Sequence, residues 1–180
     1  MSSTGRASKR EAKDFYPTPP WLTEALCEEL EELLIPPESI LEPAAGDGAI
    51  TKVLEETWPL ADIHQLDIRH EPSVDFLTEP PKPEFDLIIT NPPYSHALEF
   101  VKRAMEWRRN FNSTVVMLLR LNWLGSQVRA SWLRKNPPEV WVTPRRPCFI
   151  KGTADSCEYA WFLWGPQIPW GTRWLSTEKG

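Results

Sequence analysis

The sequence predicts an α/β protein whose central sheet has seven strands, is mostly parallel and ends in an antiparallel hairpin strand. Three observations lead to this prediction. Short apolar runs alternate with amphipathic stretches along most of the chain, which is the pattern of β-α units. Residues 114–120 contain an uninterrupted apolar run, typical of a central parallel strand. Residues 139–143 and 157–164 are β segments joined without a helix, which indicates a hairpin.

Length and composition set the outer limits. A chain of 180 residues fits one domain, which we expect over residues 14–164. Residues 1–13 are polar and basic and are expected to form a flexible tail, and residues 165–180 an irregular one. No apolar run reaches the roughly 18–20 residues of a membrane span. Three scattered cysteines indicate a reducing cytoplasm rather than a disulfide framework, and the few histidines lack zinc-site spacing, so no metal is expected.

Charge is divided unevenly between the two halves of the chain. Residues 1–96 hold seven Lys and Arg and nineteen Asp and Glu, whereas residues 97–180 hold thirteen and six. The formal charges are therefore −12 and +7, which together give the net charge of −5. We interpret the second half as a surface that can face phosphate, although a solvated charge distribution without function would give the same counts.

The first predicted helix covers about residues 19–34. Thr18 is placed to cap it, because two prolines follow and proline is favourable in a first helical turn. Leucines recur at helical spacing inside this segment, and glutamates form its other face. Pro36 and Pro37 then end the helix.

A strand, a glycine-containing turn and the start of a helix are predicted over residues 39–50. A second strand, residues 62–67, ends in Asp67, nineteen residues beyond Gly48. Glycines let a ligand approach the backbone closely, and an acid at about this separation binds a ribose diol in dinucleotide-binding folds. The pattern therefore indicates a site for a nucleoside-like ligand.

A nicotinamide cofactor is one candidate for that site. The full phosphate-binding pattern needs a third Gly or Ala, and Thr51 occupies that position. Glu42 and Asp47 would also repel a pyrophosphate. A ligand that carries ammonium and sulfonium groups would tolerate both carboxylates better.

Residues 75–77 read as a short third strand or a turn, and residues 85–90 as a buried strand. The Asn-Pro-Pro-Tyr motif (residues 91–94) follows that strand at the sheet edge where α/β proteins bind ligands. The prolines have no N–H, so the chain presents carbonyl acceptors beside the amide of Asn91 and the ring of Tyr94. Acceptors and a stacking ring suit a planar amino group, such as that of a flipped-out base. A strand followed by a proline-rich turn is an equally good interpretation of the motif alone.

The basic half follows this motif. Ser95 is expected to cap a helix over about residues 96–110, and another helix is expected near residues 126–135. We interpret His96 as a surface residue of the first turn rather than a proton shuttle. Cys148 is interpreted as a core or loop cysteine. Four residues are candidates for nucleic-acid contacts at the ligand edge or at the hairpin tip: Arg120, Trp123, Arg145 and Arg146.

Taken in order, these motifs resemble those of the S-adenosylmethionine-dependent DNA adenine-N6 methyltransferases. Phe15-Tyr16-Pro17-Thr18-Pro19 resembles the family's N-terminal cofactor motif, and residues 42–48 resemble its Gly-rich motif. The tetrapeptide at residues 91–94 is the catalytic motif in its Asn form. Residues 144–147 and 159–162 resemble small phage-encoded members. The resemblance covers about residues 14–164.

The resemblance implies a Rossmann-like methyltransferase fold, S-adenosylmethionine as cofactor and DNA, in preference to RNA, as substrate. It implies that catalysis involves Asn91, Pro92, Pro93 and Tyr94. It also implies that Asp67 is the ribose-binding acid and that Asp75 and Phe76 read the cofactor's adenine. The residues that the resemblance implies for cofactor binding are Tyr16, Thr18, Glu42, Ala44, Gly46, Gly48, Asp67, Ile68, Asp75, Phe76 and Asn91.

One departure concerns target recognition. Family members with this motif order usually carry a separate target-recognition domain, and only about 16 residues follow the last predicted strand. We therefore expect a short or degenerate sequence preference, unless a homodimer or a partner chain supplies specificity. Alternative functions are methylation of RNA adenine or protein glutamine, which present a similar planar nitrogen, and a catalytically silent module that binds cofactor or nucleic acid.

Overall fold

A computed structural model describes residues 17–149, 155–169 and 171–176. Helices and strands alternate through the first part of the chain, as the apolar runs predict. The helices are α1 (Pro20–Leu33), α2 (Ala49–Thr57), α3 (Ala97–Trp107) and α4 (Gln127–Lys135), with short 3-10 turns η1 (Tyr94–His96) and η2 (Leu121–Leu124). The strands are β1 (Ser39–Glu42), β2 (Asp62–Gln65), β3 (Leu87–Thr90), β4 (Thr114–Arg120), β5 (Glu139–Val142), β6 (Tyr159–Trp164) and β7 (Thr172–Trp174).

The seven strands form one sheet in the order β2-β1-β3-β4-β6-β5-β7. Pairings from β2 to β4 are parallel, β6 pairs antiparallel with both β4 and β5, and β7 pairs parallel with β5. A mostly parallel seven-stranded sheet with an antiparallel hairpin is the fold class that the sequence predicts, and the prediction is confirmed.

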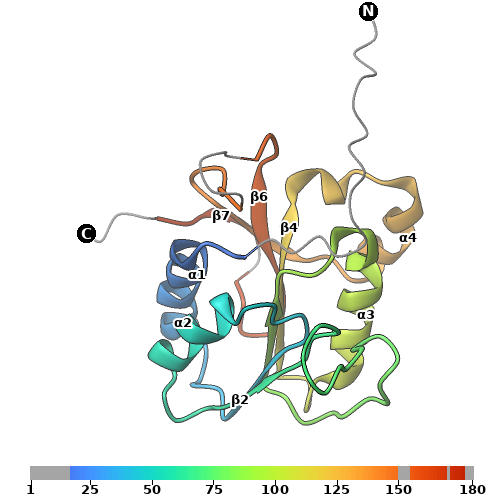
Figure 1. Cartoon of the computed structure of the whole chain (residues 1–180). Helices are drawn as coiled ribbons and strands as arrows, with labels where there is room; N and C mark the ends of the chain where they lie inside the picture. The colour runs from blue at the N-terminus through green and yellow to red at the C-terminus, as the bar shows by residue number, and fades with distance from the viewer. Residues whose placement is uncertain (1–16, 150–154, 170, 177–180) are drawn as a thin grey trace, which may run out of the picture.

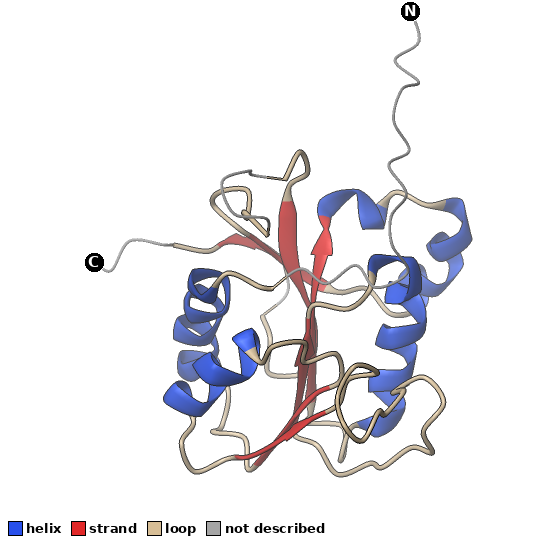
Figure 2. Ribbon diagram, viewed as in Figure 1, coloured by secondary structure: helices blue, strands red, loops and turns tan. Residues whose placement is uncertain are grey.

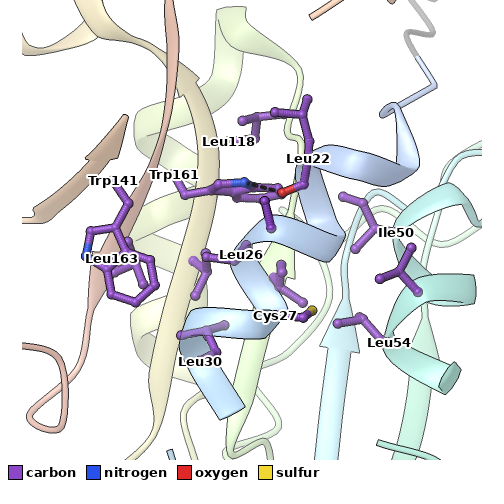
Figure 3. Packing of buried hydrophobic residues seen from close by; sticks show 14 of the residues in the cluster. Leu22, Leu26, Cys27, Leu30, Ile50, Leu54, Leu118, Trp141, Trp161 and Leu163 are labelled. Atoms are coloured by element: carbon purple, nitrogen blue, oxygen red, sulfur yellow. Dashed lines mark hydrogen bonds between the residues drawn. The ribbon is translucent and has the colours of Figure 1, made fainter. Parts of the chain in front are cut away.

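Helices cover both faces of this sheet (Figures 1 and 2). Helices α1 and α2 lie on one face, and α3 and α4 lie on the other. The α1 face is filled by leucines at helical spacing, and the indole N–H of Trp161 donates a 3.0 Å hydrogen bond to the Leu22 carbonyl within that layer (Figure 3). This buried bond ties α1 to β6, because an indole N–H needs an acceptor when it is removed from water.

The number of strands is the predicted one, but β7 is not among the strands that the sequence predicts. Residues 75–77, for which the sequence predicts a short strand or a turn, form a turn. The apolar side chain of Phe76 belongs to the core, where it packs against Phe100 and Trp107. Residues 165–180 were predicted to be an irregular tail, and that prediction is wrong for Thr172–Trp174, which forms the edge strand β7. The predicted basic tail, residues 1–13, lies outside the described residues.

Two predicted helix caps are also wrong. Helix α1 begins after Pro19, which has no capping side chain, and α3 begins after His96 rather than with a cap from Ser95. The Thr18 hydroxyl instead lies at the side chain of Asn91. Among the described residues, no helix is long and apolar enough to span a membrane.

Candidate active site

A cavity of about 710 Å³ opens at the carboxyl ends of β1, β2, β3 and β4. Segments that follow these strands line it, so residues far apart in the sequence meet at one sheet edge, as expected for a parallel α/β sheet. The lining includes residues 42–47 after β1, residues 67–69 after β2, the Asn-Pro-Pro-Tyr motif after β3 and Arg120 at the end of β4. The predicted cofactor residues Thr18, Ala44, Ile68, Asp75 and Phe76 also line it, whereas Gly48 is not among its lining residues and Tyr16 lies outside the described residues.

The turn between β1 and α2 depends on its glycines. Gly46 and Gly48 have φ angles of 62° and 76°, a left-handed conformation that residues with a side chain rarely adopt. The N–H of Gly46 donates to the Asp67 carboxylate at 2.8 Å, and the Gly46 carbonyl lies 2.7 Å from Nε2 of His70. The segment after β2 therefore fixes the glycine turn through both the N–H and the carbonyl of Gly46.

Asp67 is buried and all its acceptor positions are used within the chain. Besides Gly46 N–H, its oxygens accept the backbone N–H of Arg69 at 2.8 Å and the Nε and Nη2 groups of the same guanidinium at 2.9 Å each. Burial pushes the pKa of Asp67 upward, but these hydrogen bonds outweigh it and hold the pKa at about 2. The acid predicted to bind ribose is thus ionised and paired with Arg69, a neighbour that sequence reasoning missed.

Glu42 lines the cavity and is 1% exposed. Its carboxyl group accepts a hydrogen bond from the Thr51 hydroxyl, which explains a threonine at this helix position. Burial, together with the nearby charges of Asp47 and Asp67, raises the pKa of Glu42 to about 8 despite the bond from Thr51. Without a cationic ligand, Glu42 is therefore largely neutral at pH 7. Of the two carboxylates expected to repel a pyrophosphate, only Asp47 then contributes a negative charge.

The side chain of Asn91 is fixed by a residue from another element. Its Nδ2 donates to the hydroxyl of Thr18 at 3.2 Å. Its Oδ1 is buried, and no described residue donates a hydrogen bond to it. A buried carbonyl oxygen without a donor is uncommon and costly, which marks this atom as an acceptor for a group brought by a ligand. The structure thus turns one end of the amide toward the protein and leaves the other end open.

Tyr94 is half-buried rather than an exposed platform. The Arg120 guanidinium lies 4.9 Å from the centre of its ring, and the ring of Tyr159 lies 5.9 Å away. Arg120 is held there by the Tyr159 hydroxyl at 2.9 Å and by the Asp155 carboxylate at 3.1 Å. Burial raises the pKa of Tyr94 far above its ordinary value, so the phenol stays neutral. Asp155 and Tyr159 are further residues that sequence reasoning missed as neighbours of the motif.

The candidate nucleic-acid residues have different surroundings. Trp123, a candidate for nucleic-acid contacts, is 6% exposed and packs edge-on against Phe162 and Trp164, so little of its ring is accessible to a ligand. Arg145 is exposed and its guanidinium lies 4.4 Å from the centre of the Trp21 ring. Arg146 pairs with Glu158 on the surface. Among the described residues, no cluster of side chains has the composition of a metal site.

No protein-family model matches the chain, and no curated protein is similar to it in sequence. Solved structures are similar in fold. A candidate class I S-adenosylmethionine-dependent methyltransferase from Listeria monocytogenes superposes with a TM-score of 0.61 at 14% identity, over 87% of this chain and 64% of the other. A modification subunit of a candidate type I restriction enzyme from Vibrio vulnificus gives 0.61 at 15%, over 91% and 46%. A predicted O-methyltransferase from Agrobacterium tumefaciens gives 0.56 at 12%, over 86% and 83%.

The chain spans 64% and 46% of the first two of these structures. At identities below a fifth, the likeness concerns the arrangement of helices and strands and not the residues of the site. The chain therefore has the Rossmann-like fold found in these methyltransferases.

Proposed function

We propose that this protein transfers the methyl group of S-adenosylmethionine to the exocyclic N6 amine of adenine in DNA, presented as a flipped-out base. The observation that supports this most is the Oδ1 atom of Asn91, a buried acceptor without a donor among the described residues. Asn91 lines the same cavity as the glycine turn and Asp67. One cavity thus combines a nucleoside-type site with an open acceptor for an amine.

The residues of the cavity fit S-adenosylmethionine. Asp67 is ionised and would accept a ribose diol in exchange for its bonds to the Arg69 side chain, and Ile68, Asp75 and Phe76 line the same cavity, where an adenine ring and its amine would find apolar and acidic partners. Glu42 and Asp47 also line the cavity, near enough to each other and to Asp67 for their charges to interact, and they suit the cationic end of the molecule. When bound, the cofactor supplies an electrophilic methyl group on a sulfonium.

The chain's own residues act on the acceptor amine. The N6 lone pair of adenine is delocalised into the ring and is a weak nucleophile. The Oδ1 atom of Asn91 and the carbonyl of Pro92 accept its two N–H groups, which favours a pyramidal nitrogen and frees the lone pair. Positioning by these two acceptors supplies the rest of the rate enhancement. An amide has no useful basicity, so Asn91 is not a general base, and the proton leaves to water after transfer.

Tyr94 provides the stacking surface for the flipped base. Tyr94 lines the same cavity as Asn91, and stacking of a base on an aromatic ring is worth about 1–3 kcal/mol. Arg120 covers part of the ring in the structure, so the base takes the side that faces the cavity or displaces the guanidinium.

DNA as substrate is supported by the charge distribution and by the basic hairpin loop. Arg145 and Arg146 are exposed at that loop, and we propose that they contact phosphate without reading bases. Two similar folds belong to proteins named as methylation components of restriction systems. We propose strong selectivity for adenine, a flanking preference of two or three bases, and a partner chain or a homodimer where recognition is stringent.

The test is incubation of the protein with labelled S-adenosylmethionine and separate pools of unmethylated DNA, RNA and protein, followed by digestion and chromatography. We expect label in N6-methyladenine from DNA. Asn91→Ala should abolish transfer and leave cofactor affinity within about tenfold, since its open acceptor serves the target amine. Label in RNA or in glutamine instead of DNA would show that the proposed substrate is wrong. Turnover retained by Asn91→Ala would refute the assigned role of the motif.

A further inference from the structure

Asp67 has no acceptor position left for a ligand in the structure. A carboxylate offers about four lone-pair positions, and four N–H groups occupy those of Asp67. Two come from the backbone, at Gly46 and Arg69, and are fixed by the turns that they hold together. The other two come from the Arg69 guanidinium, which is a side-chain fork on a partly exposed residue.

The guanidinium and a ribose diol present the same pattern to a carboxylate. Each offers two neighbouring donors that bind the two oxygens as a pair, N–H groups in one case and O–H groups in the other. The backbone donors need not move when one pair replaces the other. Asp47 also lies close enough for its charge to raise the pKa of Arg69, after the larger effect of Asp67, so a second anion is at hand for a displaced guanidinium.

We propose that Arg69 competes with the cofactor ribose for Asp67 and thereby sets the affinity of the cofactor site. This inference rests on the proposed function, since it takes Asp67 as the ribose acceptor. Arg69 is an affinity-determining residue and not a catalytic one. The free enzyme keeps the buried carboxylate paired, and binding exchanges the two guanidinium bonds for two hydroxyl bonds.

Removal of the charged Arg69 side chain should therefore tighten cofactor binding rather than weaken it. If the Asp67 carboxylate is free of the guanidinium in about one molecule in ten, the apparent affinity for the cofactor is about tenfold weaker than that of a carboxylate that is always free. We therefore expect Arg69→Ala to bind S-adenosylhomocysteine about tenfold more tightly than the wild type in isothermal calorimetry. Arg69→Lys keeps the charge but loses the fork, so its gain should be smaller.

Two controls separate competition from a general effect on the fold. S-adenosylhomocysteine that lacks both the 2′- and the 3′-hydroxyl should show no gain with Arg69→Ala, because it cannot replace the guanidinium. Arg173→Ala removes an arginine that pairs with Glu29 away from the cavity, and its affinity should equal that of the wild type.

Three results overturn the inference. Unchanged or weaker binding by Arg69→Ala, with a wild type that binds, shows that Arg69 is no competitor and leaves the proposed function intact. An equal gain for the dideoxy compound shows that the ribose is not the group displaced. No binding by any variant, all of them folded by thermal melting, overturns the proposed function and this inference with it.

Discussion

Thr18→Val tests whether the Thr18 hydroxyl orients the side-chain amide of Asn91. Valine has nearly the same shape as threonine and lacks the hydroxyl, so the change removes the acceptor that lies 3.2 Å from Nδ2 of Asn91. Because Thr18 is 5% exposed, the Nδ2 donor is left without a partner in a site that water reaches poorly. Leaving a buried polar group unpaired costs about 1–3 kcal/mol, which lowers the melting temperature of a domain of this size by roughly 2–12 °C.

The same change should slow catalysis. A neutral hydrogen bond contributes about 0.5–1.5 kcal/mol, so loss of the oriented carbonyl should lower kcat about two- to twelvefold in the N6-methylation assay. Thr18 also lines the cavity, so cofactor affinity must be measured beside kcat, and we expect it to change less.

The chain provides a matched control. Thr23 lies in α1, is fully buried, and its hydroxyl has no partner among the described residues, so Thr23→Val should be neutral or slightly stabilising. The reasoning fails if Thr18→Val matches the wild type in kcat and melting temperature, or if both variants lose the same stability.

Three further predictions concern other parts of the site. Burial raises the pKa of Glu42 to about 8 from an ordinary value of 4.5, so the folded state holds a proton that the unfolded chain has lost, and the free energy of unfolding should fall by up to ~1.4 kcal/mol per pH unit between these values. Urea unfolding at several pH values should show this slope weakened in Glu42→Gln. Tyr94→Ala should weaken DNA binding by about 1–3 kcal/mol, whereas Tyr94→Phe should have little effect; equal losses in a DNA-binding titration would assign the role to the hydroxyl. Arg145→Ala combined with Arg146→Ala should reduce the salt dependence of DNA binding by up to about two phosphate contacts, and an unchanged slope would remove this loop from the interface.

The strands that could be predicted from sequence are those whose burial leaves a pattern in the residues. β4 is apolar through almost its whole length because both of its faces are covered. β7 has three residues, two of them exposed, at the edge of the sheet, so its pairing with β5 depends on the fold around it and leaves no apolar run. Phe76 left both a strand and a turn open, since an apolar residue in a turn can belong to the core without belonging to a strand.

The motifs of the site could be located from sequence, but the contacts between them could not. Spacing places Asp67 and Asn91 at the ends of strands, and the structure brings both to one cavity. Whether their oxygens are open or occupied depends on side chains from other segments, Arg69 in one case and Thr18 in the other. An arginine two residues after an acid was a signal available in the sequence. The link between Thr18 and Asn91 was not, because 73 residues separate them.

The uneven charge of the chain has a counterpart in the order of the strands. β2, β1 and β3 all come from residues 1–96, which carry −12, and β4, β6, β5 and β7 all come from residues 97–180, which carry +7. Among the strands, the boundary between the two halves therefore falls between β3 and β4, whereas helix α1 of the acidic half packs against β6 of the basic half. The acidic side contributes the carboxylates of the cavity, which suit a cationic cofactor, and the basic side contributes Arg120 and the hairpin loop, which suit a polyanionic substrate. The Asn-Pro-Pro-Tyr motif follows β3, the last strand of the acidic side, and so stands where two ligands of opposite charge would meet.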